Sequence, residues 1–229
     1  MKRPSGPHGI RITCAGLLLV VAACQTGSAP VAETLTPLTE SSFDFTDPAA
    51  FRLVSEGDEP LLELLASAEY APPYRSPHAI ALLGGLEFRS FVLDAELQQT
   101  GREYGHRDLC LFFGFESAER FYYVHMATTP DQNAHNVFLV DQAARRNLLP
   151  PQSQGVEWGN GEWHHIRLAR DVDAGLVQVY FDDMVTPVLE VEDVTIEWGR
   201  IGFGSFDDTG LFRNVVLTDY ESRLGPHGI

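Results

Sequence analysis

Apolar and polar side chains alternate along most of the chain after residue 84. This alternation is typical of β-strands that bury one face, because successive side chains of a strand point to opposite sides. Gly, Asp and Pro separate the alternating runs, as expected of turns. The predicted strands are 85–99, 108–115, 120–127, 135–141, 162–171, 175–183, 199–206 and 210–220.

Two pairs of these segments are predicted hairpins. The first joins 162–171 to 175–183, and the second joins 199–206 to 210–220 through the polar turn 207–209. Helical periodicity is rare, and 60–69 is the one candidate for a short helix, with irregular structure as the alternative. The pattern predicts an all-β, antiparallel sandwich or jelly roll.

The first residues have the pattern of an export signal. Basic residues precede an apolar run, 15–23, that is too short to span a membrane. The run ends in Val-Ala-Ala-Cys, which resembles the bacterial lipobox and implies a lipid on Cys24; an ordinary cleaved signal is the alternative. Gln25 favours the outer membrane. The predicted segments are a signal peptide (1–23), a tether (24–42), the domain (43–222) and a tail (223–229).

Composition limits the partners. The chain has 16 Lys and Arg against 32 Asp and Glu, a net charge of −16, so nucleic acid and anionic lipid surfaces are poor partners. A lipid anchor is then the only predicted membrane contact. Of the three cysteines, Cys14 is removed with the signal and Cys24 is lipidated. Cys110 has no partner, so the domain is expected to fold without a disulfide.

The segment 106–126 concentrates the chemical side chains. With a turn at 116–119, Phe115 faces Arg120, Phe113 faces Tyr122 and Leu111 faces Val124, which makes this face the core. The opposite face is then aromatic and polar, as in a sugar-binding groove. It carries Asp108, Cys110, Phe112, Gly114, Phe121, Tyr123 and His125.

These positions suggest roles. We expect Phe112 and Tyr123 to stack on a sugar ring, and Asp108 and His125 to act as acid and base if the protein is an enzyme. His106 and Arg107 precede the strand and are expected to bind hydroxyl or carboxylate groups. Two alternatives are that this face packs against other segments as core, and that Cys110 and His125 form a nucleophilic pair.

Further candidate site residues lie in predicted loops. His135 lies in a polar loop, 128–136, that is expected to form a wall of the site, and Trp158 in a turn is expected to offer a stacking surface. The alternatives are a polar turn and a loop anchor. Asp207 and Asp208 are candidate calcium ligands because Ca²⁺ prefers clustered carboxylate oxygens, although Asp is also a routine turn residue. Beyond this structural Ca²⁺, no cofactor is predicted.

Two C-terminal stretches are similar to known domains. One is similar to laminin-G-like domains and reads GEWHHIRLARDVDAGLVQVYFDDM. The other resembles the closing strands of concanavalin A-like lectin/glucanase domains and reads WGRIGFGSFDDTGLFRNVVL. Together with the FFGF and FYY segments, they also resemble the 3-keto-disaccharide hydrolase family. The resemblance covers Phe43 to Tyr220 and implies a concanavalin A-like jelly roll with glycan on its concave sheet.

The same resemblance leaves the activity open. The paired-acid strand Glu-x-Asp-x-(x)-Glu of β-glucanases is absent, and so are the motifs of jelly-roll alginate lyases. The sequence therefore predicts a carbohydrate-recognising envelope lipoprotein that is either a glycoside hydrolase or a non-catalytic binding module. A structural envelope protein is the third alternative.

Overall fold

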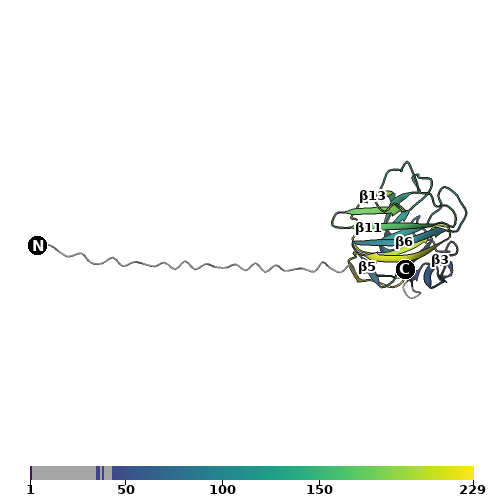
Figure 1. Ribbon diagram of the computed structural model, residues 1–229, viewed down its shortest axis with the longest axis horizontal. Helices are drawn as coiled ribbons and strands as arrows, with labels where there is room; N and C mark the ends of the chain where they lie inside the picture. Colours follow the sequence, from purple (N-terminus) through teal and green to yellow (C-terminus); the bar gives the residue numbers. More distant parts are fainter. Residues whose placement is uncertain (2–34, 37, 39–42) are drawn as a thin grey trace. The chain divides into compact units, whose positions relative to one another are not determined.

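The computed structural model describes Met1, Leu35, Thr36, Leu38 and residues 43–229 (Figure 1). The predicted signal peptide, the lipidation site Cys24 and most of the predicted tether lie outside the described residues. Within the described part, no helix is long and apolar enough to cross a membrane.

The first seven-stranded sheet contains the hairpin segment 106–126, and we call it the β7–β8 sheet. All its neighbouring strands are antiparallel. In spatial order its strands are β1 (Phe43–Phe45), β4 (Ala79–Leu83), β14 (Arg200–Ser205), β7 (Cys110–Ser117), β8 (Arg120–His125), β9 (Asn136–Asp141) and β10 (Arg146–Asn147).

The second seven-stranded sheet, called the β6–β11 sheet, is also antiparallel, and Figure 1 shows its strands β13, β11 and β6 in one layer. A small sheet pairs β16 (Ser222–Leu224) with β5 (Leu86–Phe88), and a single 3-10 turn, η2 (Pro48–Ala50), precedes β2. The spatial order of the second sheet is β13 (Leu189–Glu192), β12 (Leu176–Phe181), β11 (Trp163–Asp171), β6 (Phe91–Gln99), β15 (Gly210–Thr218), β3 (Glu59–Leu64) and β2 (Phe51–Glu56).

The main core lies between the two sheets. Leu111, Phe113 and Tyr122 of the β7–β8 sheet belong to one buried cluster with Leu97 and Leu168 of the β6–β11 sheet. Strands β6 and β11 alternate between buried and half-exposed positions, as their sequence pattern predicts. The prediction of an all-β antiparallel sandwich is confirmed.

The helical candidate at 60–69 is wrong. Residues 59–64 form β3, which pairs with β2 on one side and with β15 on the other. Leu61, Leu62 and Leu64 are buried there, so sheet pairing and burial override the helical propensity of this short Leu-rich run.

One predicted hairpin is confirmed and one is wrong. β11 pairs with β12 from Asp171 opposite Leu176 onward, as predicted. The segment 199–206 instead supplies β14 of the β7–β8 sheet, whereas 210–220 supplies β15 of the β6–β11 sheet. The turn 207–209 therefore crosses from one sheet to the other. Alternation cannot distinguish these two connections, because both strands bury one face in either case.

The β7–β8 hairpin has the predicted register only in its inner half. Leu111 pairs with Val124 and Phe113 with Tyr122, as expected, but Ser117 rather than Phe115 pairs with Arg120. The register shifts near Gly114, whose positive φ of 55° suits a β-bulge. Because of this bulge, Phe115 belongs to the cluster on the opposite face from the one predicted.

Contacts with the domain begin before the predicted boundary at residue 43. Leu35 forms a β-bridge with Leu217, in which the two backbone N–H groups donate to the partner carbonyls at 3.0 and 2.9 Å. Leu38 is also buried. At least these positions of the predicted tether are part of the folded domain.

Candidate functional site

The aromatic face of the β7–β8 sheet is covered. Phe112 and Tyr123 are fully buried in a second cluster, against which Tyr70, Tyr74 and Phe206 pack. Tyr70 and Tyr74 belong to the irregular segment 65–78, which lies across this face. The expectation that Phe112 and Tyr123 stack on a sugar is therefore wrong for this structure, because neither ring has a solvent-exposed face.

Trp158 and His135 are also buried. The Trp158 indole N–H donates to the carbonyl of Met126 at 2.9 Å, so this side chain anchors a loop and offers no exposed stacking surface. The His135 Nδ1 atom accepts from the backbone N–H of Ala127 at 3.3 Å, and His135 lines a different hollow of the surface. Neither side chain reaches the cavity described next.

Four predicted residues meet around one cavity. This Asp108 cavity has a volume of about 210 Å³, and Asp108, His125, His106 and Asp207 line it. Asp108 lies two residues before the start of β7 and His125 ends β8, so strand pairing brings both to the same end of the hairpin. Asp207 comes from the connection between the two sheets. A cluster of ionisable groups around a cavity is the usual arrangement of a binding or catalytic site.

Most of the remaining walls come from residues that the sequence did not single out as site residues; the exception is Asn133, which belongs to the 128–136 loop expected to form a wall of the site. Arg145 stacks over the ring of Phe206, with the guanidinium carbon 5.5 Å from the ring centroid, and it donates to the hydroxyl of Tyr123. These side chains come from separate loops, and no short motif connects them. The other lining residues are Arg75, Tyr104, Asn133, Arg145 and Phe206.

Asp108 is held by a dense set of donors. Its carboxylate accepts hydrogen bonds from the Ser205 hydroxyl at 2.9 Å, the Cys110 thiol at 3.0 Å and the backbone N–H of Phe206 at 3.2 Å. Burial, and to a smaller extent the negative charge of Asp208, raise the pKa of Asp108 to about 8. A carboxyl group that keeps its proton near neutral pH has the protonation state of a general acid.

The pKa of His125 is shifted in the opposite direction. Burial lowers the pKa of His125 to about 3, so its imidazole is neutral at physiological pH. Its Nε2 atom lies 3.2 Å from the carbonyl oxygen of His106, and its buried Nδ1 atom has no partner among the described residues. Cys110, in contrast, is buried and its thiol pKa is raised well above 9, chiefly by desolvation, which argues against a nucleophilic Cys110–His125 pair.

His106 and Arg107 come directly before Asp108 in the chain. The exposed side of the site carries His106, whose Nε2 atom is 3.2 Å from a carboxylate oxygen of Asp131. Arg107 points away from the Asp108 cavity; it is 2% exposed and donates to the carbonyls of Gly159 and Gly101 at 2.6 and 3.2 Å. The prediction placed His106 and Arg107 together, but they line different cavities.

Three carboxylates cluster beneath the cavity. One oxygen each of Asp108, Asp207 and Asp208 lies within 4.8 Å of the others, an arrangement that could hold a cation. However, Asp208 accepts from the Tyr104 hydroxyl at 2.6 Å and from the backbone N–H of Asp108 at 2.8 Å. A Ca²⁺ ion would have to compete with these bonds for its oxygen ligands. Calcium at Asp207 and Asp208 stays a prediction.

These pKa shifts predict an optimum in stability near pH 6.5. The folded pKa of Asp108 lies above its unfolded value, so its stabilising contribution falls as the pH rises from about 4 to about 8. His125 and His135, with pKa values lowered to about 3 and about 4, contribute stability that is lost as the pH falls below 6.5. Between about pH 4 and 6.5 the two histidines outweigh Asp108, whereas above pH 6.5 the contribution of Asp108 outweighs theirs.

We therefore expect the free energy of unfolding to fall by about 1 kcal/mol between pH 6.5 and 8, because the loss from Asp108 exceeds the remaining gain from the two histidines. Urea unfolding at a series of pH values would measure this, and Asp108→Asn should remove the fall. A wild-type stability that stays level or rises over this interval would contradict the assignment.

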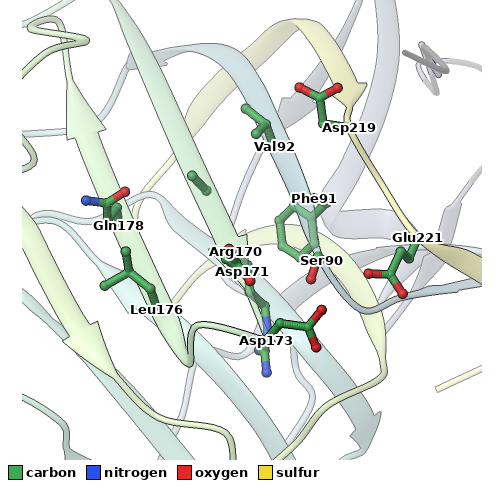
Figure 2. A pocket seen from close by; sticks show the side chains of 11 residues that line it. Ser90, Phe91, Val92, Arg170, Asp171, Asp173, Leu176, Gln178, Asp219 and Glu221 are labelled. Atoms are coloured by element: carbon green, nitrogen blue, oxygen red, sulfur yellow. The ribbon is translucent and has the colours of Figure 1, made fainter. Parts of the chain in front are cut away.

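A larger hollow lies elsewhere on the surface. It has a volume of about 370 Å³. Figure 2 shows Asp171, Asp173, Asp219 and Glu221 among its lining side chains, near the start of β6 and the end of β11. Arg89 donates to Asp173 at 2.6 Å and to Glu221 at 3.3 Å. These two carboxylates are therefore occupied by an ion-pair network. None of the side chains selected from the sequence lies in this hollow, so the Asp108 cavity is the better candidate.

Comparisons with known proteins identify the fold. No model of a known protein family and no curated protein sequence matches the chain. Among solved structures, the carbohydrate binding module CBM66 from Bacillus subtilis aligns over 78% of this chain and 96% of its own, with a TM-score of 0.54 and 13% identity.

A seed lectin from Lotus tetragonolobus aligns over 85% of this chain and 99% of its own, with a TM-score of 0.53 and 13% identity. A protein from Parabacteroides distasonis, provisionally described as a glycosyl hydrolase, aligns over 79% and 90%, with a TM-score of 0.51 and 10% identity. The chain thus has the concanavalin A-like jelly-roll fold that the sequence resemblance implied. At these identities the likeness concerns the fold alone.

Proposed function

We propose that this protein recognises carbohydrate in the Asp108 cavity. The observation that carries the proposal is the mixture of groups there: the carboxylate of Asp207 and the amide of Asn133 can accept from hydroxyls, and Arg145 can donate. The half-exposed ring of Phe206 adds an apolar surface for sugar C–H groups. This combination of hydrogen-bonding groups beside an aromatic ring suits a polyhydroxylated ligand.

The size of the cavity limits the ligand. At about 210 Å³, it is smaller than the pockets of roughly 300–1,000 Å³ that hold drug-sized ligands. We therefore expect it to hold one sugar ring. That a carbohydrate binding module and a seed lectin have the same fold supports this class of ligand.

Two histidines provide a matched test of this proposal. His106 lines the cavity and pairs with Asp131, whereas His165 lies on the β6–β11 sheet and pairs with Asp94; both side chains are 42% exposed. We expect His106→Ala to weaken sugar binding at least about fivefold, the effect of losing roughly 1 kcal/mol. His165→Ala should leave it unchanged. A glycan array followed by calorimetry would measure both, and equal affinities of the two variants would refute the placement.

Hydrolysis is a second candidate function, favoured by one specific observation. The pKa of Asp108 is raised to about 8 and that of His125 is lowered to about 3 in the same cavity. Groups whose pKa values are pushed apart in this way can act as acid and base near neutral pH. In this assignment Asp108 donates a proton to the leaving group, and neutral His125 accepts one from water.

Product analysis separates the two functions. The protein would be incubated with plain and 3-keto disaccharides and with polysaccharides, with and without calcium. New reducing ends that disappear in Asp108→Asn and His125→Ala would establish an enzyme. Sugar binding without any product would leave a non-catalytic binding module and reject the acid and base roles.

We also propose that the protein is a lipoprotein of the bacterial envelope, anchored in the outer membrane through Cys24. The support is the lipobox-like sequence Val-Ala-Ala-Cys after the apolar run. Cys24→Ser should move the protein from the membrane pellet to the soluble fraction and abolish labelling by radioactive palmitate. Retention of label in this variant would contradict the anchor.

A further inference from the structure

We propose that a second cavity, next to the Asp108 cavity, binds the adjoining residue of an oligosaccharide. This inference rests on the proposed carbohydrate recognition. The second cavity, called the Glu103 cavity, has a volume of about 370 Å³. The residues that could contact a ligand there are Glu103, Tyr104, Arg107, Thr128, Thr129 and Glu157.

One short segment separates the two cavities. Along 103–108, His106 and Asp108 line the Asp108 cavity, whereas Glu103 and Arg107 line the Glu103 cavity. Tyr104 lines both cavities, so the two spaces are adjacent at this side chain. If one sugar of an oligosaccharide fills the Asp108 cavity, the adjoining sugar extends either past Tyr104 into the Glu103 cavity or out to solvent.

Tyr104 is a fixed wall between the cavities. Its hydroxyl donates to Asp208 at 2.6 Å, and the guanidinium carbon of Arg102 lies 4.7 Å from its ring centroid. An aromatic ring held at both its edge and its face loses little conformational entropy when a sugar packs against it. The wall is therefore preorganised for a ligand that extends across both cavities.

Arg107 gives an independent indication of a binding site. The side chain is 2% exposed, and its two terminal nitrogens donate to loop carbonyls, but its buried Nε–H has no partner among the described residues. A buried donor without an acceptor is costly and calls for an explanation. A hydroxyl group in the Glu103 cavity, accepting directly or through a water molecule, would satisfy this donor.

The charges in the Glu103 cavity define the class of sugar. Glu103 and Glu157 are exposed carboxylates, and Thr128 and Thr129 line the same cavity. Carboxylates accept hydrogen bonds from sugar hydroxyls or amino groups and repel anions. The terminal nitrogens of Arg107 are already occupied by carbonyls. The second unit is therefore a neutral or amino sugar and not a uronate or a sulfated sugar.

The test compares ligand length with variants of the second cavity. The probes are glucose, galactose, mannose, fructose and N-acetylglucosamine, each as the monosaccharide and as its homo-oligosaccharides of two to four units. We expect one series to bind the wild type, with an affinity that rises at least about tenfold from the monosaccharide to the disaccharide. The double variant Glu103→Gln, Glu157→Gln should lose most of this rise while keeping the monosaccharide affinity.

A second double variant, Glu119→Gln, Glu192→Gln, is the control, because it removes two other exposed carboxylates that line neither cavity. It should behave as the wild type. If the disaccharide binds no more tightly than the monosaccharide, or if the Glu103 cavity variant keeps the full rise, the second cavity is rejected and the proposed function stands. If no sugar binds the wild type, both proposals are rejected.

Discussion

Phe112→Ala is expected to lower the free energy of unfolding by about 3–5 kcal/mol, the cost of truncating a fully buried phenylalanine. Phe112 is 0% exposed and packs between Phe121 and Tyr123, with ring centroids 5.9 and 6.0 Å away. Truncation leaves a void that the surrounding strands can close only in part. Urea or thermal unfolding would measure the loss.

Phe206→Ala is the matched control for this change. Phe206 belongs to the same aromatic face, but its ring is half-exposed and lines the Asp108 cavity. We expect Phe206→Ala to lower the free energy of unfolding by less than about 2 kcal/mol, because the Phe206 ring is already partly solvated in the folded protein. Its main effect should be on sugar affinity. If Phe112→Ala instead abolished binding without destabilising the fold, the original assignment of Phe112 as a stacking surface would be restored.

Asp208→Ala is expected to cost about 3 kcal/mol of stability, because two hydrogen bonds to a charged acceptor are lost and their donors are left without it. The side chain is 3% exposed and accepts from the Tyr104 hydroxyl and from the backbone N–H of Asp108. These bonds join the 101–108 loop to the connection between β14 and β15. Chemical denaturation of the variant would give the size of the loss.

Asp207→Ala is the control for Asp208. Its side chain is exposed, and its bond from the Tyr104 hydroxyl is long, at 3.5 Å. We expect a change within about 0.5 kcal/mol, as for most surface substitutions. Removing the charge of Asp208 should also lower the pKa of Asp108, because that charge helps to raise it. Equal destabilisation by the two alanine variants would show that the Asp208 hydrogen bonds do not support the loop.

The inner half of the β7–β8 hairpin could be predicted from sequence, whereas its outer half could not. Alternation places Leu111 opposite Val124 because both must reach the core. The bulge around Gly114 lengthens β7 relative to the strands on either side of it, and from that point Phe115 points to the other face. A one-residue change of register reverses the facing of every later side chain, and nothing in the alternation marks where it occurs.

The burial of the aromatic face also could not be predicted from the sequence. The sequence brought Asp108 and His125 to one end of a hairpin, and the structure places both around one cavity. It gave no sign that Tyr70 and Tyr74 would cover Phe112 and Tyr123, since burial by a distant, irregular segment leaves no local pattern. Which residues of this face stay accessible is therefore a tertiary outcome.

The sequence by itself determined most of the strands after residue 84 and, through its resemblance to known domains, the concanavalin A-like fold. Strand formation depends on alternation and turn chemistry, which are local properties of neighbouring residues. Only the tertiary structure decided that β14 and β15 join different sheets, and that Arg145, Phe206 and Tyr104 complete the Asp108 cavity. These contacts join residues far apart in the chain, so they follow from packing of the whole domain and from no single stretch of sequence.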